Sequence, residues 1–197
     1  MDALSVDDYQ ELRDEYIARN LYLYIFEISS PRGFGEAWAQ GHLKELVPDL
    51  KKPTKKIDRD YAGQYDFLLD VRIRIEVKAS RAVDKETAAP LYVKALASDS
   101  SRPFWMNFQQ IKPRCCDVFI WVAVWRDVIR YWILASRELE TNKHYSQGQH
   151  RGNVGEGQLH VREDNIADFS EYEAKSNQLG DAIRAAWRRQ ISLQQTR

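Results

Sequence analysis

Two acidic residues and a lysine lie in a stretch whose polar and apolar residues alternate. The stretch covers residues 65–78 and contains Asp66, Glu76 and Lys78. Alternation with period two predicts β-strands, and a short turn centred on Val71 would make the stretch a β-hairpin. In that register Asp66 faces Glu76 across the two strands at about 5 Å. Lys78 follows on the same face, about 7 Å from Glu76.

These residue types suit the metal-assisted hydrolysis of a phosphodiester. Facing carboxylates bind a hard cation such as Mg²⁺, which keeps several waters, and one of these waters can become the nucleophile. The backbone carbonyl of Val77 can add an oxygen ligand. Lys78 can orient or deprotonate the attacking water, or offset charge on the phosphate.

A solvent-exposed sheet face with cross-strand ion pairs would show the same alternation. The spacing acid-x-Lys also arises from composition alone, and it recurs at Asp49-x-Lys51 and Glu173-x-Lys175. Only the copy at Glu76 lies on a patterned strand with an acidic residue opposite. The alternation by itself leaves both interpretations open.

The segment resembles the PD-(D/E)XK nuclease superfamily, which includes many type II restriction endonucleases. In that family an Asp begins one strand and Glu/Asp-x-Lys lies on the next, as in Tyr65-Asp66 followed by Glu76-Val77-Lys78. Tyr65 stands where the family usually has proline. The surroundings are similar as well, over about residues 33–134: a preceding glutamate-bearing helix resembles Gly35-Glu36-Ala37-Trp38, and an aromatic, Gln-rich turn before a hydrophobic hairpin resembles Phe108-Gln109-Gln110-Ile111 and Asp117-Val118-Phe119-Ile120-Trp121.

The resemblance implies an α/β fold with a restriction-endonuclease-like central mixed β-sheet flanked by α-helices. It implies that Asp66, Glu76 and the Val77 carbonyl bind Mg²⁺, for which Mn²⁺ can substitute. Lys78 would be catalytic, and Glu36 would add a ligand or hold a water. Glu27 is a second candidate for that helix-borne acid, and the sequence leaves the choice open.

The implied function is a Mg²⁺-dependent endonuclease that hydrolyses DNA phosphodiester bonds, in the first place a type II restriction endonuclease. One such site cuts one strand, so a homodimer is expected if both strands are cut. Two alternatives stay open. One is a catalytically inactive nucleic-acid-binding or interaction module of the same fold, and the other is a DNA-repair or mobile-element nuclease.

Further residues are candidates for contact with the nucleic acid. Ser80 and Arg81 directly follow the motif and can hold a phosphate. Long polar loops on a rigid sheet often carry DNA contacts. On this ground the candidates include Arg151 and Asn153 of the polar segment 136–160. Gln109 and Gln110 are candidates because they can contact the cleaved strand or orient Lys78. Each of these side chains is equally typical of an ordinary polar surface.

The elements that position these residues are predicted from periodicity. Apolar residues three, four or seven apart predict helices at residues 7–30, 35–47 and 179–194. Runs rich in β-branched and aromatic residues predict two hairpins, with strands at 65–69, 72–79, 118–125 and 128–134. Between them we expect a loop with at most a short helix at 82–103, a helical turn or two at 105–111, and a polar loop at 136–160. This order predicts one domain over residues 1–197.

Composition sets few limits on the partner. Lys and Arg number 29 and Asp and Glu number 29, and a neutral total neither supports nor excludes nucleic acid, because local distribution sets a binding face. The first residues lack the pattern of a signal peptide, and no apolar run reaches the roughly 20 residues that span a bilayer. The adjacent Cys115 and Cys116 suit neither a disulfide nor a metal site. We therefore expect a cytoplasmic protein without a membrane partner.

Overall fold

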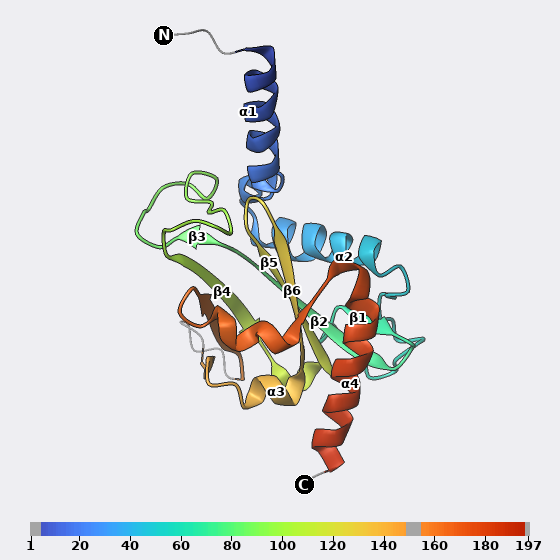
Figure 1. Ribbon diagram of the computed structural model, residues 1–197. Helices are drawn as coiled ribbons and strands as arrows, with labels where there is room; N and C mark the ends of the chain where they lie inside the picture. The colour runs from blue at the N-terminus through green and yellow to red at the C-terminus, as the bar shows by residue number, and fades with distance from the viewer. Residues whose placement is uncertain (1–4, 149–154, 196–197) are drawn as a thin grey trace.

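The computed structural model describes residues 5–148 and 155–195. It is an α/β structure with three layers, in which helices cover one face of a five-stranded sheet and a second sheet covers the other (Figure 1). We call the five-stranded sheet "sheet A". Its strands, in spatial order, are β1 (Phe67–Leu69), β2 (Ile73–Arg81), β5 (Val118–Val124), β6 (Ile129–Ala135) and β9 (Glu173–Ala174). Because β2 and β5 are parallel and the other neighbours antiparallel, sheet A is mixed, as predicted.

The second sheet, "sheet B", is antiparallel throughout. Its strands, in spatial order, are β3 (Val83–Asp84), β4 (Phe104–Ile111), β8 (Gly157–Arg162) and β7 (Tyr145–Gln147). Three short helical segments connect strands: η3 (Pro113–Cys115), α3 (Ser136–Glu140) and η4 (Ile166–Tyr172). A fourth, η5 (Ser176–Gln178), follows β9.

The central strand β5 explains why the layers hold together. Every residue of β5 is buried and apolar, which is typical of a strand covered on both faces. Val118, Ile120 and Val122 pack towards the helices, whereas Phe119 and Trp121 pack against sheet B. Successive side chains of a strand point to opposite faces, so one apolar run supplies both cores.

Helices cover the first face of sheet A. They are η1 (Leu23–Glu27), the π-helix η2 (Gly33–Ala39), α2 (Gln40–Leu46) and α4 (Leu179–Gln195). The predicted C-terminal helix is confirmed, and it buries Leu179, Ile183 and Ala186. By contrast, α1 (Val6–Arg19) buries no residue and projects from the body (Figure 1).

The first predicted hairpin is confirmed together with its register. Phe67 lies opposite Ile75 and Leu69 opposite Ile73. The turn has positive φ at two residues, Asp70 (53°) and Val71 (61°). Asp70 accepts hydrogen bonds from Nε and Nη2 of Arg184 on α4, at 2.8 and 3.0 Å, and so has a structural partner. The second hairpin, β5–β6, is confirmed as well.

Some predictions of local structure are wrong. The predicted helix 7–30 ends at Arg19, because Asn20 stops it with a side-chain amide that donates to the Tyr16 carbonyl at 2.7 Å. Residues 105–111 belong to strand β4 rather than to a helix, since Met106 and Phe108 alternate into the core between the sheets.

Two predicted loops also contain regular structure. The segment 82–103 contains strand β3 and no helix. The segment 136–160 contains α3, β7 and the first residues of β8, while Arg151 and Asn153 lie outside the described residues. No helix in the described part of the chain is long and apolar enough to cross a bilayer.

Candidate active site

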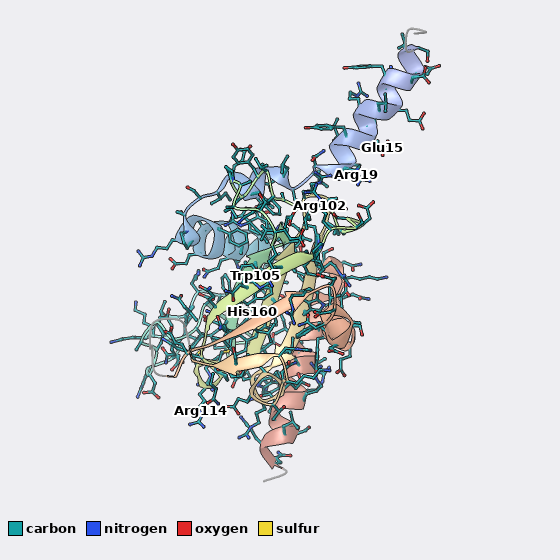
Figure 2. The ribbon with its side chains drawn as sticks, turned by 90° about the vertical axis from the view of Figure 1, so that its left-hand side faces the viewer. Glu15, Arg19, Arg102, Trp105, Arg114 and His160 are labelled. Atoms are coloured by element: carbon teal, nitrogen blue, oxygen red, sulfur yellow. The ribbon has the colours of Figure 1, made fainter. Side chains whose placement is uncertain are left out.

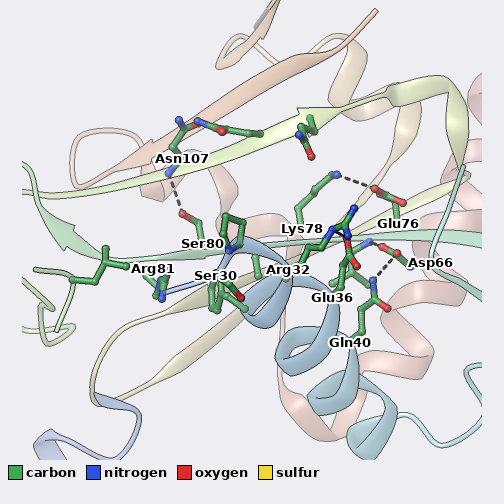
Figure 3. A pocket seen from close by; sticks show the side chains of 18 of the residues that line it. Ser30, Arg32, Glu36, Gln40, Asp66, Glu76, Lys78, Ser80, Arg81 and Asn107 are labelled. Atoms are coloured by element: carbon green, nitrogen blue, oxygen red, sulfur yellow. Dashed lines mark hydrogen bonds and ion pairs between the residues drawn. The ribbon is translucent and has the colours of Figure 1, made fainter. Parts of the chain in front are cut away.

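A cleft of about 1050 Å³ opens along one edge of sheet A. Strand β1 covers β2 only as far as Ile75, so the second half of β2 forms the floor of the cleft. η2 lies on one side of this floor and β4 on the other (Figure 3). Asp66, Glu76 and Lys78 all line the cleft, so the structure brings the three predicted residues together.

Asp66 directly precedes β1, and two donors fix its carboxylate. Oδ2 accepts a hydrogen bond from the backbone N–H of Val77 at 2.8 Å, and Oδ1 accepts one from Nε2 of Gln40 at 2.6 Å (Figure 3). In a strand the N–H and C=O of one residue point to the same side. The Val77 carbonyl is therefore directed to the same open edge of β2 as Asp66.

Glu76 and Lys78 lie on the floor of the cleft and form an ion pair. Glu76 Oε1 and Lys78 Nζ are 2.8 Å apart, and each side chain is only 15% exposed. Burial raises the pKa of Glu76 to about 7, even though Lys78 lowers it, and Asp66 raises it further. Removal from water disfavours the charged carboxylate, as does a second carboxylate nearby. A proton or a bound cation would relieve this repulsion.

Gln40 and Lys52 lie beside Asp66 and are not among the catalytic or metal-binding residues predicted from the sequence. Gln40, on α2, connects Asp66 to Lys52, because Lys52 Nζ donates to Gln40 Oε1. Lys52 also lies over the Phe67 ring, 4.4 Å from its centroid. A signal for Gln40 was present, since it follows Glu36 by four residues and so shares its helix face. The resemblance implies an acid on this helical segment, whereas the residue that contacts Asp66 is a glutamine.

Glu36 lines the cleft at its mouth, but it makes no contact with Asp66 of the kind that Gln40 makes. Its side chain is 67% exposed and lies 3.8 Å from Arg32. The competing candidate, Glu27, ends η1 and is not among the described residues that line the cleft. Gln40 is thus the residue of this helical segment that contacts Asp66.

The predicted substrate contacts that the structure describes all line the cleft. Ser80 Oγ accepts a hydrogen bond from the Asn107 N–H at 3.0 Å and so connects β2 to β4. Arg81 Nη1 donates to the carbonyls of Ile25 and Ile28, at 3.1 and 2.8 Å. The Arg81 guanidinium also stacks on Phe34, and burial lowers its pKa.

Gln109 and Gln110 are exposed and lie at a bulge of β4. Gln110 has φ of 56°, a conformation that non-glycine residues adopt mainly where the surrounding structure requires it. Bulges often re-aim side chains beside functional sites. Here the bulge presents both amides to the wall of the cleft.

The donors of the cleft fit a hard divalent cation. In the described part of the chain, three or more His, Cys, Asp or Glu residues nowhere gather into a metal-binding group. Asp66, Glu76 and the Val77 carbonyl form a set of oxygen donors instead. Mg²⁺ prefers oxygen, keeps several waters and needs only one or two carboxylates from the protein.

No model of a known protein family matches this chain, and no curated protein matches it in sequence. Any function assigned to the cleft therefore depends on its own residues and their arrangement.

Proposed function

We propose that this protein is a Mg²⁺-dependent endonuclease that hydrolyses DNA phosphodiester bonds. One observation carries the proposal: Asp66, Glu76 and Lys78 line one open cleft, with Glu76 and Lys78 paired at 2.8 Å. The mixed sheet A, with helices on one face, supports a restriction-endonuclease-like fold around this PD-(D/E)XK-type site.

The side chains of the cleft have separate roles in this proposal. Mg²⁺, held by Asp66, Glu76 and the Val77 carbonyl, would supply Lewis acidity and lower the pKa of a bound water. Gln40 and the Val77 N–H hold the Asp66 carboxylate in place. Lys78 brings a positive charge to the position where negative charge develops on the phosphate.

The walls of the cleft hold the substrate strand. Strand β4 and the turns of η2 lie on opposite sides of β2 (Figure 3), and fixing the phosphate between them would convert attack by water into an effectively unimolecular step. The cleft is open, so it suits an internal bond of a polymer. A type II restriction endonuclease is the first biological role we propose, and a second copy of the chain would cut the other strand.

Cleavage of a supercoiled plasmid tests the proposal. We expect nicking or linearisation with Mg²⁺, none with EDTA, and a loss of about 100-fold or more in Lys78→Ala and Glu76→Gln. Lys78→Ala removes a positive charge beside the reacting phosphate, and Glu76→Gln removes a carboxylate that would bind Mg²⁺. Lys175→Ala is a matched control, because Glu173-x-Lys175 has the same spacing outside the cleft.

Cutting that persists at the wild-type rate in Lys78→Ala, or in EDTA, would remove this cleft from consideration. Binding of DNA without cutting at any Mg²⁺ concentration would indicate the inactive binding module instead.

A further inference from the structure

The face of sheet B that points away from sheet A carries a row of polar and aromatic side chains. Along β4 and β8, Met106, Phe108, Leu159 and Val161 are buried against sheet A. The alternate residues are half-buried or exposed, and we call them the outer row: Trp105, Asn107 and Gln109 on β4, and Gln158, His160 and Arg162 on β8. Figure 2 shows Trp105 and His160 close together on the neighbouring strands.

The outer row begins inside the cleft. Trp105, Asn107 and Gln109 line the cleft together with Lys78, and the Asn107 N–H donates to Ser80 Oγ at 3.0 Å. Ser80 follows Lys78 by two residues on β2, a separation of about 7 Å. The members on β8 lie one strand further out, a step of about 4.8 Å. A duplex held at the catalytic residues would therefore meet the row within its first few base pairs.

Two atoms of the outer row have unused hydrogen-bonding capacity. Asn107 Oδ1 and His160 Nε2 are buried and have no hydrogen-bond partner among the described residues. Asn107 and His160 are opposite each other in the β4–β8 register. Folded proteins pair nearly all such groups with protein atoms, ordered water or a ligand.

The side chains of the row match base edges better than phosphates. Asn and Gln pair with adenine and Arg pairs with guanine in the major groove, whereas phosphate contacts depend on a surplus of cations. Arg162 is the one cation of the row, and it lies 3.2 Å from Asp164. Burial lowers the pKa of His160, and Arg162 and Lys85 lower it further, which favours the neutral ring.

We propose that the outer row contacts base edges of DNA beside the cleaved bond and so sets the sequence preference of this protein. The proposal rests on the nuclease function proposed above and deepens it, because it names the residues that would read the DNA sequence. The composition of the outer row disfavours a protein partner, since Trp105 is the only large apolar side chain of the row.

The test is a binding selection that does not need cutting. Lys78→Ala protein is incubated with DNA duplexes that carry a randomised segment, and the bound duplexes are sequenced. The same selection is made with Lys78→Ala combined with Gln109→Ala and His160→Ala. Gln178→Ala in the Lys78→Ala background is the matched control, because Gln178 is exposed and lies outside both sheets.

We expect a base preference in Lys78→Ala and in the control, and a loss of at least ten-fold in enrichment at two or more positions in the outer-row variant. The dependence of binding on salt should stay the same, since losing a base contact releases no phosphate contact. Thermal unfolding shows that each variant is folded.

An unselective pool, or a preference that the outer-row variant retains, would overturn the inference. The two proposals can also fail separately. If the base preference disappears in the outer-row variant but the wild-type protein never cuts DNA, the proposed catalysis is overturned and the base-contact proposal is supported.

Discussion

The Glu76 side chain is a largely buried carboxylate on the floor of the cleft. Its pKa is raised to about 7, first because of burial, whereas a glutamate in an unfolded chain titrates near 4.3. A raised carboxylate pKa means that the folded state prefers the protonated form. The stabilisation that results is fully present below the pKa of the unfolded chain, about 4.3. It is lost as the pH rises through the folded-state pKa of about 7.

Replacement by a neutral isostere should therefore change how stability depends on pH. In EDTA, Glu76→Gln should gain stability relative to the wild type as the pH rises from about 5 to 8, by on the order of 1–3 kcal/mol. Urea denaturation at several pH values measures the difference. A difference that does not change with pH would show that Glu76 is not held in a charge-excluding site.

Gln40 holds Asp66 through a 2.6 Å hydrogen bond and is itself bound by Lys52. Removing an outer partner of a metal ligand typically costs 10–100-fold in metal affinity or activity. We therefore expect Gln40→Ala to lower both Mg²⁺ affinity and cutting by about that factor. Gln40→Glu loses the same donor but adds a carboxylate beside Asp66, so it should bind Mg²⁺ more tightly than Gln40→Ala.

Calorimetric titration with Mg²⁺ separates these outcomes, and Glu36→Gln is the control. Glu36 is exposed at the mouth of the cleft, so its replacement should change affinity by less than about three-fold. A large loss of Mg²⁺ affinity in Glu36→Gln, together with unchanged affinity in Gln40→Ala, would show that Glu36 rather than Gln40 supports the metal site.

At the scale of elements, the β1–β2 hairpin owes its register to two features. Alternation buries Phe67, Leu69, Ile73, Ile75 and Val77 on one face, and a slip of one residue would expose all of them. The turn then decides which residues face each other. It places Val71, a β-branched residue, at φ of 61°, a conformation that costs roughly 1–2 kcal/mol for most residues.

Val71→Gly should therefore stabilise the protein, by about 0.5–1 kcal/mol after the greater freedom of glycine in the unfolded chain is included. The Val71 side chain is exposed, so little packing is lost. Urea denaturation measures the change, and plasmid cutting should stay at the wild-type rate. Destabilisation would show that the Val71 side chain supports the turn.

The apolar residues of β4 explain why the sequence predicts a helical turn or two at residues 105–111. Trp105, Phe108 and Ile111 are three apart, so the segment has an apolar spacing of helical type as well as an alternation of strand type. Local pattern does not choose between them. Sheet A offers an apolar face, and β4 packs Met106 and Phe108 against it as a strand that pairs with β8.

At the scale of the whole molecule, the candidate site lies where the three layers meet. β2 belongs to sheet A, β4 to sheet B, and η2 with α2 to the helical layer, and each contributes a side of the cleft. The Asp66 carboxylate depends on two of these layers, since its partners come from β2 and from α2. A change in how the helices pack on sheet A would therefore disturb the hydrogen bond between Gln40 and Asp66.

What the sequence determined by itself is local. Two hairpins, the C-terminal helix and the opposition of Asp66 and Glu76 follow from period-two and period-3.6 patterns, because these depend on residues near one another in the chain. The tertiary structure alone decided that β2 pairs with β5, that Gln40 and Lys52 join Asp66, and that sheet B forms a wall of the cleft. Those contacts join distant segments, and their stability comes from burying side chains of separate elements together, which no local pattern records.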